Sequence, residues 1–206
     1  FPRADRPVSK GGATSFSTEI QRDSVNEAKT VMDLAEIERG TTVADIGAGE
    51  GYYTVRLAAR VGKKGRVLAQ DIDEGALHRL GERVERERLD NVSIKLGAPD
   101  DPRLPVASFD RIFLVHMYHE VANPYEFLYN LAPAISPGGR VAVVDVDRPI
   151  SRHGTPASLL KCEMAAMGYQ ERGVERLDGD VTYVAVFDVP AHPTPPAQIK
   201  VCRPAK

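Results

Sequence analysis

The chain has 206 residues, of which 42% are hydrophobic and 27% are charged, so it is long enough to bury one sizeable core and suggests a single domain. A formal net charge of −2 excludes the broad basic field that holds nucleic acid non-specifically, which favours a small-molecule or protein partner. No apolar run approaches the roughly 20 residues that span a bilayer, so no membrane segment is predicted.

The two cysteines, Cys162 and Cys202, are too few for a disulfide scaffold. They also lack the spacing of a redox or zinc motif, so buried or free thiols are the favoured interpretation and one disulfide is the alternative. The sequence begins at Phe1 rather than at a methionine, and nothing at its start resembles the apolar core of a signal peptide. We expect a cytoplasmic protein, with export after loss of a leader as the alternative.

Residues 1–19 are rich in proline, glycine, serine and arginine, which predicts an extended arm that could fold over a site as a lid. Residues 20–189 are predicted to form the main domain. Its first helix is expected over 20–38, because apolar residues recur there at helical spacing and Gly40 follows as a stop. The apolar residues in question are Val25, Ala28, Val31, Met32 and Ala35.

Five short apolar runs then alternate with segments long enough for a helix or a crossover loop, which favours a parallel sheet. The predicted strands are Val43–Ile46, Val67–Ala69, Val92–Leu96, Ile112–Val115 and Val141–Val146. Helix starts are predicted at Asp73, at Asn123–Pro124 and at Thr155–Pro156, the last two with proline at the first helical position.

The pattern changes after Gly168. Two runs, Gly173–Leu177 and Thr182–Phe187, flank Asp178–Gly179, a pair that favours a tight hairpin turn. The predicted fold is therefore a doubly wound α/β domain whose mostly parallel, seven-stranded sheet ends in an antiparallel hairpin. Residues 190–206 contain five prolines and are predicted to form an irregular tail.

A glycine-rich loop follows the first predicted strand, in the segment Asp45-Ile46-Gly47-Ala48-Gly49-Glu50-Gly51. The next strand ends at Asp71, 24 residues after Gly47, where a carboxylate can accept hydrogen bonds from a ribose diol. Strand, glycine turn, helix, strand and acid together predict an adenosine-containing cofactor. The dinucleotide fingerprint would need glycine at Tyr52, and the phosphate-loop motif is absent, so NAD and ATP are disfavoured.

This glycine spacing resembles the first motif of class I S-adenosylmethionine-dependent methyltransferases, and the resemblance extends from about Asp23 to Phe187. It implies S-adenosylmethionine as the cofactor. It also implies that Asp45 helps to hold the cofactor ammonium, that Gly47, Gly49 and Gly51 give backbone access, that Asp71 binds the ribose and that Ile72 packs on adenine.

The sequence departs from the family pattern after the third predicted strand. Many members have Gly-Asp there, with the carboxylate on the adenine amino group, whereas this chain reads Gly97-Ala98. Ala98 cannot make that side-chain contact. Asp100 or Asp101 could reach the amine from a shifted loop, although solvated loop carboxylates are the favoured interpretation. We expect the cofactor site to survive this loss, since one hydrogen bond contributes only about 1 kcal/mol.

The segment after the fourth predicted strand holds His116, Tyr118, His119 and Glu120, at the edge where such sheets bind ligands. By the resemblance, His116 lies near the cofactor, and His119-Glu120 is similar to the His-Asp pair of plant-type small-molecule O-methyltransferases, whose histidine is the base. A histidine can remove a proton near neutral pH. His119, Glu120 and His116 are thus the catalytic candidates, with packing or capping as the alternative for His119.

Other residues of these elements are given structural interpretations. The H-x-x-H-E spacing matches no zincin pattern, so no metal site is predicted. Tyr52 and Tyr53 are interpreted as packing residues, and Pro137–Arg140 as the turn that delivers the fifth strand. Five polar residues near the end of that strand and in the next helix are interpreted as solvated surface, with substrate binding as the alternative: Asp145, Asp147, Arg148, His153 and Glu163.

The leading functional hypothesis is an enzyme that transfers a methyl group to O, N or S of a small-molecule acceptor. No nucleic-acid partner is expected, because the Asn/Asp-Pro-Pro-Tyr motif is missing after the fourth strand and no basic, aromatic stripe replaces it. A non-catalytic protein that keeps the cofactor site as a scaffold or sensor is the alternative. The sequence gives no prediction of oligomeric state.

Overall fold

A seven-stranded mixed sheet forms the centre of the computed structural model, which describes residues 1–9, 18–177 and 181–203. The strand order is β3-β2-β1-β4-β5-β7-β6. The strands are β1 (Thr42–Ile46), β2 (Arg66–Asp71), β3 (Val92–Leu96), β4 (Phe109–Val115), β5 (Ile135–Val146), β6 (Gln170–Arg176) and β7 (Thr182–Asp188). The α-helices are α1 (Glu19–Ser24), α2 (Glu27–Leu34), α3 (Tyr52–Val61), α4 (Glu74–Glu87), α5 (Pro124–Leu131) and α6 (Ala157–Ala166). Four 3-10 turns are η1 (Tyr118–Glu120), η2 (Ala132–Ala134), η3 (Ile150–Arg152) and η4 (Pro196–Gln198).

Strand directions confirm the predicted fold class. Strands β1 to β5 pair in parallel, whereas β7 pairs antiparallel with β5 and with β6. The predicted turn at Asp178–Gly179 lies outside the described residues, as do residues 10–17 of the arm expected to act as a lid.

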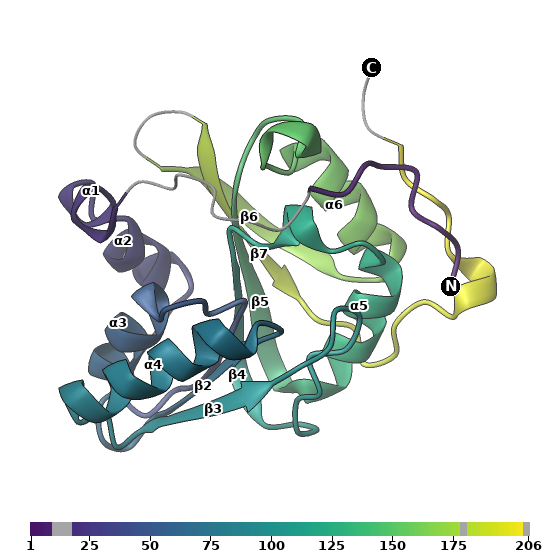
Figure 1. Cartoon of the computed structure of the whole chain (residues 1–206). Helices are drawn as coiled ribbons and strands as arrows, with labels where there is room; N and C mark the ends of the chain where they lie inside the picture. The colour runs from purple at the N-terminus through teal and green to yellow at the C-terminus, as the bar shows by residue number, and fades with distance from the viewer. Residues whose placement is uncertain (10–17, 178–180, 204–206) are drawn as a thin grey trace.

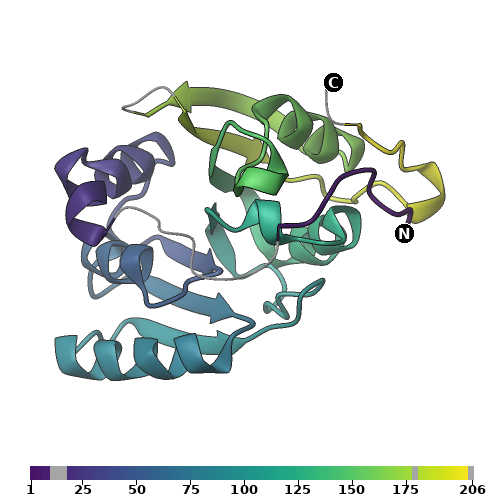
Figure 2. The same ribbon diagram turned by 45° about the horizontal axis from the view of Figure 1, so that its top comes forward.

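Helices cover both faces of the sheet (Figures 1 and 2). Alternate residues of a strand point to opposite faces, so Val43 and Phe113 pack in the cluster beneath α2 and α3, while Ala44 and Ile112 pack in the cluster beneath α5 and α6. Helix α4 packs on β2 beside α3, through Leu80 among others. Burial on both sides explains why the central strands read as continuous apolar runs.

The predicted helix over 20–38 is wrong in one respect, because the structure has two helices there. Helix α1 begins with a capping box between Thr18 and Gln21 and ends at Ser24. Asn26 then takes a left-handed conformation, with φ 53°, which asparagine tolerates better than most residues and which breaks the helical path. Helix α2 starts afresh at Glu27.

The predicted starts of α4 and α5 are confirmed, whereas helix α6 and strand β5 start at other residues than predicted. Asp73 caps α4 as expected, accepting hydrogen bonds from the backbone N–H groups of the first turn. Helix α6 begins one residue later than predicted, because the Thr155 hydroxyl is bonded to Asp145. Strand β5 begins at Ile135, so Pro137–Arg140 lies inside the strand, where its pairing with β4 shifts register.

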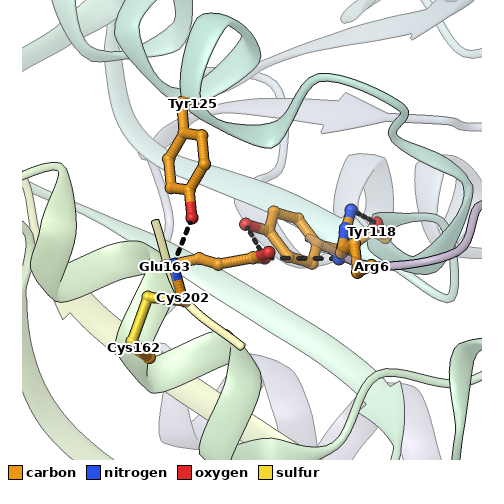
Figure 3. The surroundings of a disulfide bond; sticks show 6 residues. All are labelled: Arg6, Tyr118, Tyr125, Cys162, Glu163 and Cys202. Carbon is orange, nitrogen blue, oxygen red and sulfur yellow. Dashed lines mark hydrogen bonds and ion pairs between the residues drawn. A yellow bond between two sulfur atoms is a disulfide. The ribbon is translucent and has the colours of Figure 1, made fainter. Parts of the chain in front are cut away.

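The irregular tail is held to the domain by a disulfide between Cys162 of α6 and Cys202 (Figure 3). The expectation of two thiols is therefore wrong; chain positions 40 residues apart meet through packing that spacing could not reveal. The Cys202 backbone N–H also donates to the Tyr125 hydroxyl at 2.8 Å. Within the described ranges, the helices all lack the length and apolar character needed to cross a membrane.

Candidate active site

A cavity opens at the carboxyl-terminal edge of the parallel strands, at the point between β1 and β4 where the strand order reverses. Predicted site residues that line it are Gly47, Asp71, Ile72, Ala98, His116 and Glu120. Residues that the sequence did not single out complete the lining, namely Ile46, Gln70, Pro99, Met117, Val121, Ala122 and Phe127. The cavity therefore joins the glycine loop to the segment that follows β4.

The glycine loop needs glycine for two separate reasons. Gly47 has φ +70°, and a Cβ there would come within 2.9 Å of the Met117 Cβ, so a side chain would strain the backbone and crowd the cavity wall. Gly51 has φ +88° at the start of α3, and its Cβ would lie 2.4 Å from Leu80 Cδ1. The loop can therefore approach a ligand with its backbone.

Asp71 fixes the glycine loop from the end of β2. One carboxylate oxygen accepts the Gly49 N–H at 2.8 Å, and the other accepts the N–H groups of Ile72 at 2.7 Å and Asp73 at 3.0 Å. A carboxylate offers about four acceptor positions, so one remains for a ligand hydroxyl. Ile72 is 55% exposed at the cavity, where it offers apolar surface to a ring.

Asp45 lies beneath the glycine loop and is not one of the residues that line the cavity. Its side chain is 2% exposed and accepts the Thr54 hydroxyl at 2.6 Å. Burial raises the pKa of Asp45 to about 6, against the opposing effect of the Thr54 hydrogen bond. A nearby cation would favour the carboxylate, so the ammonium-holding role implied by the family resemblance stays a prediction.

The loop after β3 places Ala98 in the cavity wall but turns Asp100 elsewhere. Ala98 and Asp101 pair through both backbone N–H groups, at 2.8 and 3.2 Å, which closes a tight turn. The Asp100 side chain accepts a hydrogen bond from Asn123 at 3.1 Å, and Asn130 donates to its carbonyl at 2.9 Å. Asp100 therefore anchors the turn to α5 rather than lining the cavity.

His119 is fully buried in η1 and pairs with Asp145 rather than with its neighbour Glu120. Its Nδ1 lies 3.1 and 3.2 Å from the two Asp145 carboxylate oxygens. The Asp145 carboxylate also accepts hydrogen bonds from the Thr155 hydroxyl at 2.7 Å and from the backbone N–H of the next residue, Val146, at 2.8 Å. The solvated-surface interpretation of Asp145 is wrong, since both side chains of the pair are 0% exposed.

Glu120 faces the cavity from the same short turn. Burial raises the pKa of Glu120, while the nearby His119 opposes the shift, so the carboxylate is a stronger base than an ordinary glutamate. Of the two adjacent candidates, Glu120 thus lines the cavity and His119 lies behind it.

His116 connects the cavity to α2. It has φ +51°, and its Nε2 lies 3.5 Å from Glu27 Oε1. Burial would raise the pKa of Glu27, but hydrogen bonds from His116 and Arg22 outweigh it and lower that pKa to about 2. His116 therefore faces an anion that stays charged throughout the neutral range. Tyr53 donates to the same carboxylate, at 3.1 Å, and is 3% exposed, so the packing interpretation of Tyr53 is confirmed.

Arg6 was not singled out from the sequence, and Glu163 was interpreted there as solvated surface with substrate binding as the alternative. Both side chains are 1% exposed and form an ion pair at 3.2 Å beside η1, so the solvated-surface interpretation of Glu163 is wrong as well. Of the buried residues around η1 that were not recognised from the sequence, Asp145 alone carried a usable signal, because it lies at the carboxyl end of a strand. Arg6 lies in a segment without helical or strand periodicity, so its sequence context gave no indication of a site.

The comparisons with known proteins agree with this geometry. A family model described as a methyltransferase domain matches residues 43–139. A demethylmenaquinone methyltransferase of Listeria welshimeri is 27% identical over 121 residues, 59% of this chain and 51% of that protein. A ubiquinone/menaquinone biosynthesis C-methyltransferase of Klebsiella pneumoniae is 30% identical over 125 residues, 58% of this chain and 48% of that protein.

Among solved structures, a SAM-dependent methyltransferase from Aquifex aeolicus superimposes with a TM-score of 0.76 at 24% identity, over 81% of this chain and 92% of that one. The sheet has the Rossmann-like fold of that methyltransferase structure. The similarity to methyltransferases covers residues 43–139 in the family model and 58–59% of the chain in the two curated relatives. The chain spans about half the length of the curated relatives it matches.

Proposed function

We propose that this chain is an S-adenosylmethionine-dependent methyltransferase that acts on a small-molecule acceptor. The observation that carries the proposal is the single cavity that joins the glycine loop and Asp71 to Glu120. The sequence led us to expect O, N or S as the acceptor atom. The names of the two curated relatives suggest a further acceptor atom, an activated carbon of a small quinone-like molecule.

The residues around the cavity fit this cofactor. Gly47 keeps the loop backbone open, Asp71 has one acceptor position left for a ribose hydroxyl, and Ile72 presents exposed apolar surface for adenine. Asp45 is the candidate for the ammonium. When bound, S-adenosylmethionine supplies a methyl group activated by its positive sulfur.

The protein's part in the reaction is to orient the acceptor, exclude water and take up a proton. Met117, Val121 and Phe127 give the cavity an apolar wall against which an acceptor ring can lie. A Glu120 carboxylate oxygen takes the acceptor proton, which its raised pKa favours. His119 and Asp145 pack behind the turn that carries Glu120 and hold that turn in place.

Thermal unfolding with and without ligand tests the cofactor. S-adenosylmethionine or its demethylated product, at about 100 times the dissociation constant, should stabilise the protein by roughly 2.7 kcal/mol and raise the midpoint by several degrees, whereas NAD should not. Asp71→Ala should abolish the shift. Asp90→Ala, an exposed carboxylate after α4, is the matched control and should keep it. No shift in the wild type at saturating ligand would refute the cofactor.

Transfer of a labelled methyl group to a mixture of small quinols, phenols, amines and thiols tests the activity. We expect incorporation by the wild type and a loss of about 100-fold with Glu120→Gln, the range for general-base catalysis. Binding of the cofactor with no incorporation into any acceptor would favour the scaffold alternative.

The disulfide indicates the kind of cellular compartment in which the protein folds. Disulfides persist in oxidising compartments and are rare in the cytoplasm, so Cys162–Cys202 favours the exported alternative over the cytoplasmic expectation. We therefore propose that the chain matures in an oxidising compartment, where S-adenosylmethionine must be delivered from the cytoplasm. Cell fractionation with alkylation of free thiols tests this: recovery of a fully alkylated cytoplasmic protein without prior reduction would contradict it.

A further inference from the structure

The amino-terminal segment, residues 1–9, is bonded to the short turn that carries Glu120. Arg6 Nη2 donates to the carbonyl of Tyr118 at 3.1 Å and to that of Val121 at 2.6 Å. The Ser9 N–H donates to the His119 carbonyl at 3.3 Å. The Tyr118 carbonyl also accepts the Val121 N–H of the turn at 3.2 Å, so the amino-terminal segment adds a second donor there and bonds the His119 and Val121 carbonyls as well.

The Arg6 guanidinium is also enclosed by the side chains of this turn and of α6 (Figure 3). Its Nη1 lies 3.2 Å from Glu163 Oε2, and the Tyr118 hydroxyl donates to the same oxygen at 2.9 Å. Its Cζ lies 5.0 Å from the centroid of the Tyr118 ring. Arg6, Tyr118 and Glu163 thus form a buried group, and none of the three lines the cavity.

The buried ion pair between Arg6 and Glu163 is a poor way to stabilise the fold. Burial raises the pKa of Glu163 even though Arg6 and Tyr118 both oppose the shift, so desolvation of the carboxylate outweighs its interactions. Buried ion pairs can often be replaced by apolar residues without loss of stability. A single guanidinium nitrogen, Nη2, that bonds carbonyls on both sides of Glu120, by contrast, fixes the backbone of the turn and with it the direction of the Glu120 side chain.

We propose that Arg6 is a positioning residue, which holds the carbonyls of Tyr118 and Val121 and thereby aims the Glu120 carboxylate into the cavity. The inference rests on the proposed function of Glu120, because the aim matters only if that carboxylate meets the acceptor. The charged and titratable groups around Glu120 are His119, His153, Asp71 and Asp145, and none of them belongs to the Arg6 group.

Two variants separate the carbonyl bonds from the charge. Arg6→Met with Glu163→Gln removes both charges together and leaves no unpaired ion. Arg6→Lys keeps the positive charge but places all its donors on one ammonium nitrogen, which cannot hold both the two carbonyls bonded by Nη2 and the Glu163 carboxylate paired with Nη1 in the same arrangement. Tyr169→Phe is the matched destabilising control, since it removes a buried hydrogen bond to the Leu128 carbonyl without touching η1.

The readout is the titration of the Glu120 carboxyl carbon by NMR, which needs neither acceptor nor turnover. We expect the pKa of Glu120 to fall toward about 4.3, the ordinary glutamate value, in both Arg6 variants as the side chain leaves the cavity, and to stay unchanged in Tyr169→Phe. An unchanged pKa in Arg6→Lys would overturn the proposal, whatever the double variant does.

Activity gives a second, separate measure. Labelled methyl transfer should fall about tenfold in Arg6→Lys with little change in KM for S-adenosylmethionine, and Arg6→Lys should have no further effect in a Glu120→Gln background. Additive losses would overturn the positioning role. If Glu120→Gln alone keeps full activity, the proposed function of Glu120 fails, whereas the titration still decides whether Arg6 aims its side chain.

Discussion

The two sides of the candidate active site are built in different ways. On the cofactor side, Gly47, Gly49 and Asp71 lie close in sequence, and backbone hydrogen bonds within that stretch fix their geometry. On the acceptor side, Glu120 lies on a turn whose partners come from distant positions, with Arg6 bonded across 112 and 115 residues. Local sequence thus encodes the cofactor side, whereas the acceptor side depends on the complete tertiary structure.

Removal of the disulfide should have the largest effect and should act on the acceptor side. Cys162→Ser with Cys202→Ser opens a loop of 40 residues, which should cost about 4 kcal/mol and lower the unfolding midpoint by roughly 10 °C. Calorimetry checks this, and the reduced wild type should match the variant. At temperatures where both fold, the variant should keep its affinity for S-adenosylmethionine; equal loss of affinity and stability would erase the contrast between the two sides.

Gly47→Ala should weaken cofactor binding with little effect on the acceptor side. The positive φ and the close Met117 Cβ should weaken S-adenosylmethionine binding by roughly 30-fold, about 2 kcal/mol, as titration calorimetry would show. Gly138→Ala is the matched control, because that glycine also has positive φ, +80°, but no atom lies within 4 Å of its added Cβ. If both variants bind equally well, the loop does not contact the ligand.

The pH dependence of cofactor binding should show a smaller effect, through Asp45. Its raised pKa of about 6 means that the free protein holds a neutral acid below pH 6 and a carboxylate above it. If the carboxylate holds the ammonium, affinity should rise about tenfold from pH 5 to pH 7. The same group's contribution to stability without ligand is present at low pH and is lost as pH rises from about 4 through 6. Asp45→Asn should bind weakly at every pH, and an equally steep profile in that variant would exclude Asp45 as the cause.

The sequence predicted much of this arrangement because most of its signals are local. Short apolar runs separated by helix-length segments located the parallel strands, and the spacing of Gly47 and Asp71 indicated the ligand edge. Asn26 was missed as a helix break because its left-handed conformation leaves no apolar signal. His119 was paired with Glu120 because they are adjacent, whereas packing of η1 against β5 brings Asp145 to it instead.

The bonds made by Arg6 also have a consequence for the order of folding. Residues 1–9 are synthesised before their partners in η1, η3 and α6, which follow more than a hundred residues later. The glycine loop and β2 can form early from contacts within about thirty residues, since short loops close at low entropic cost. During synthesis, therefore, the chain should acquire its cofactor edge first and its acceptor turn last, when residues 1–9 have met η1, η3 and α6.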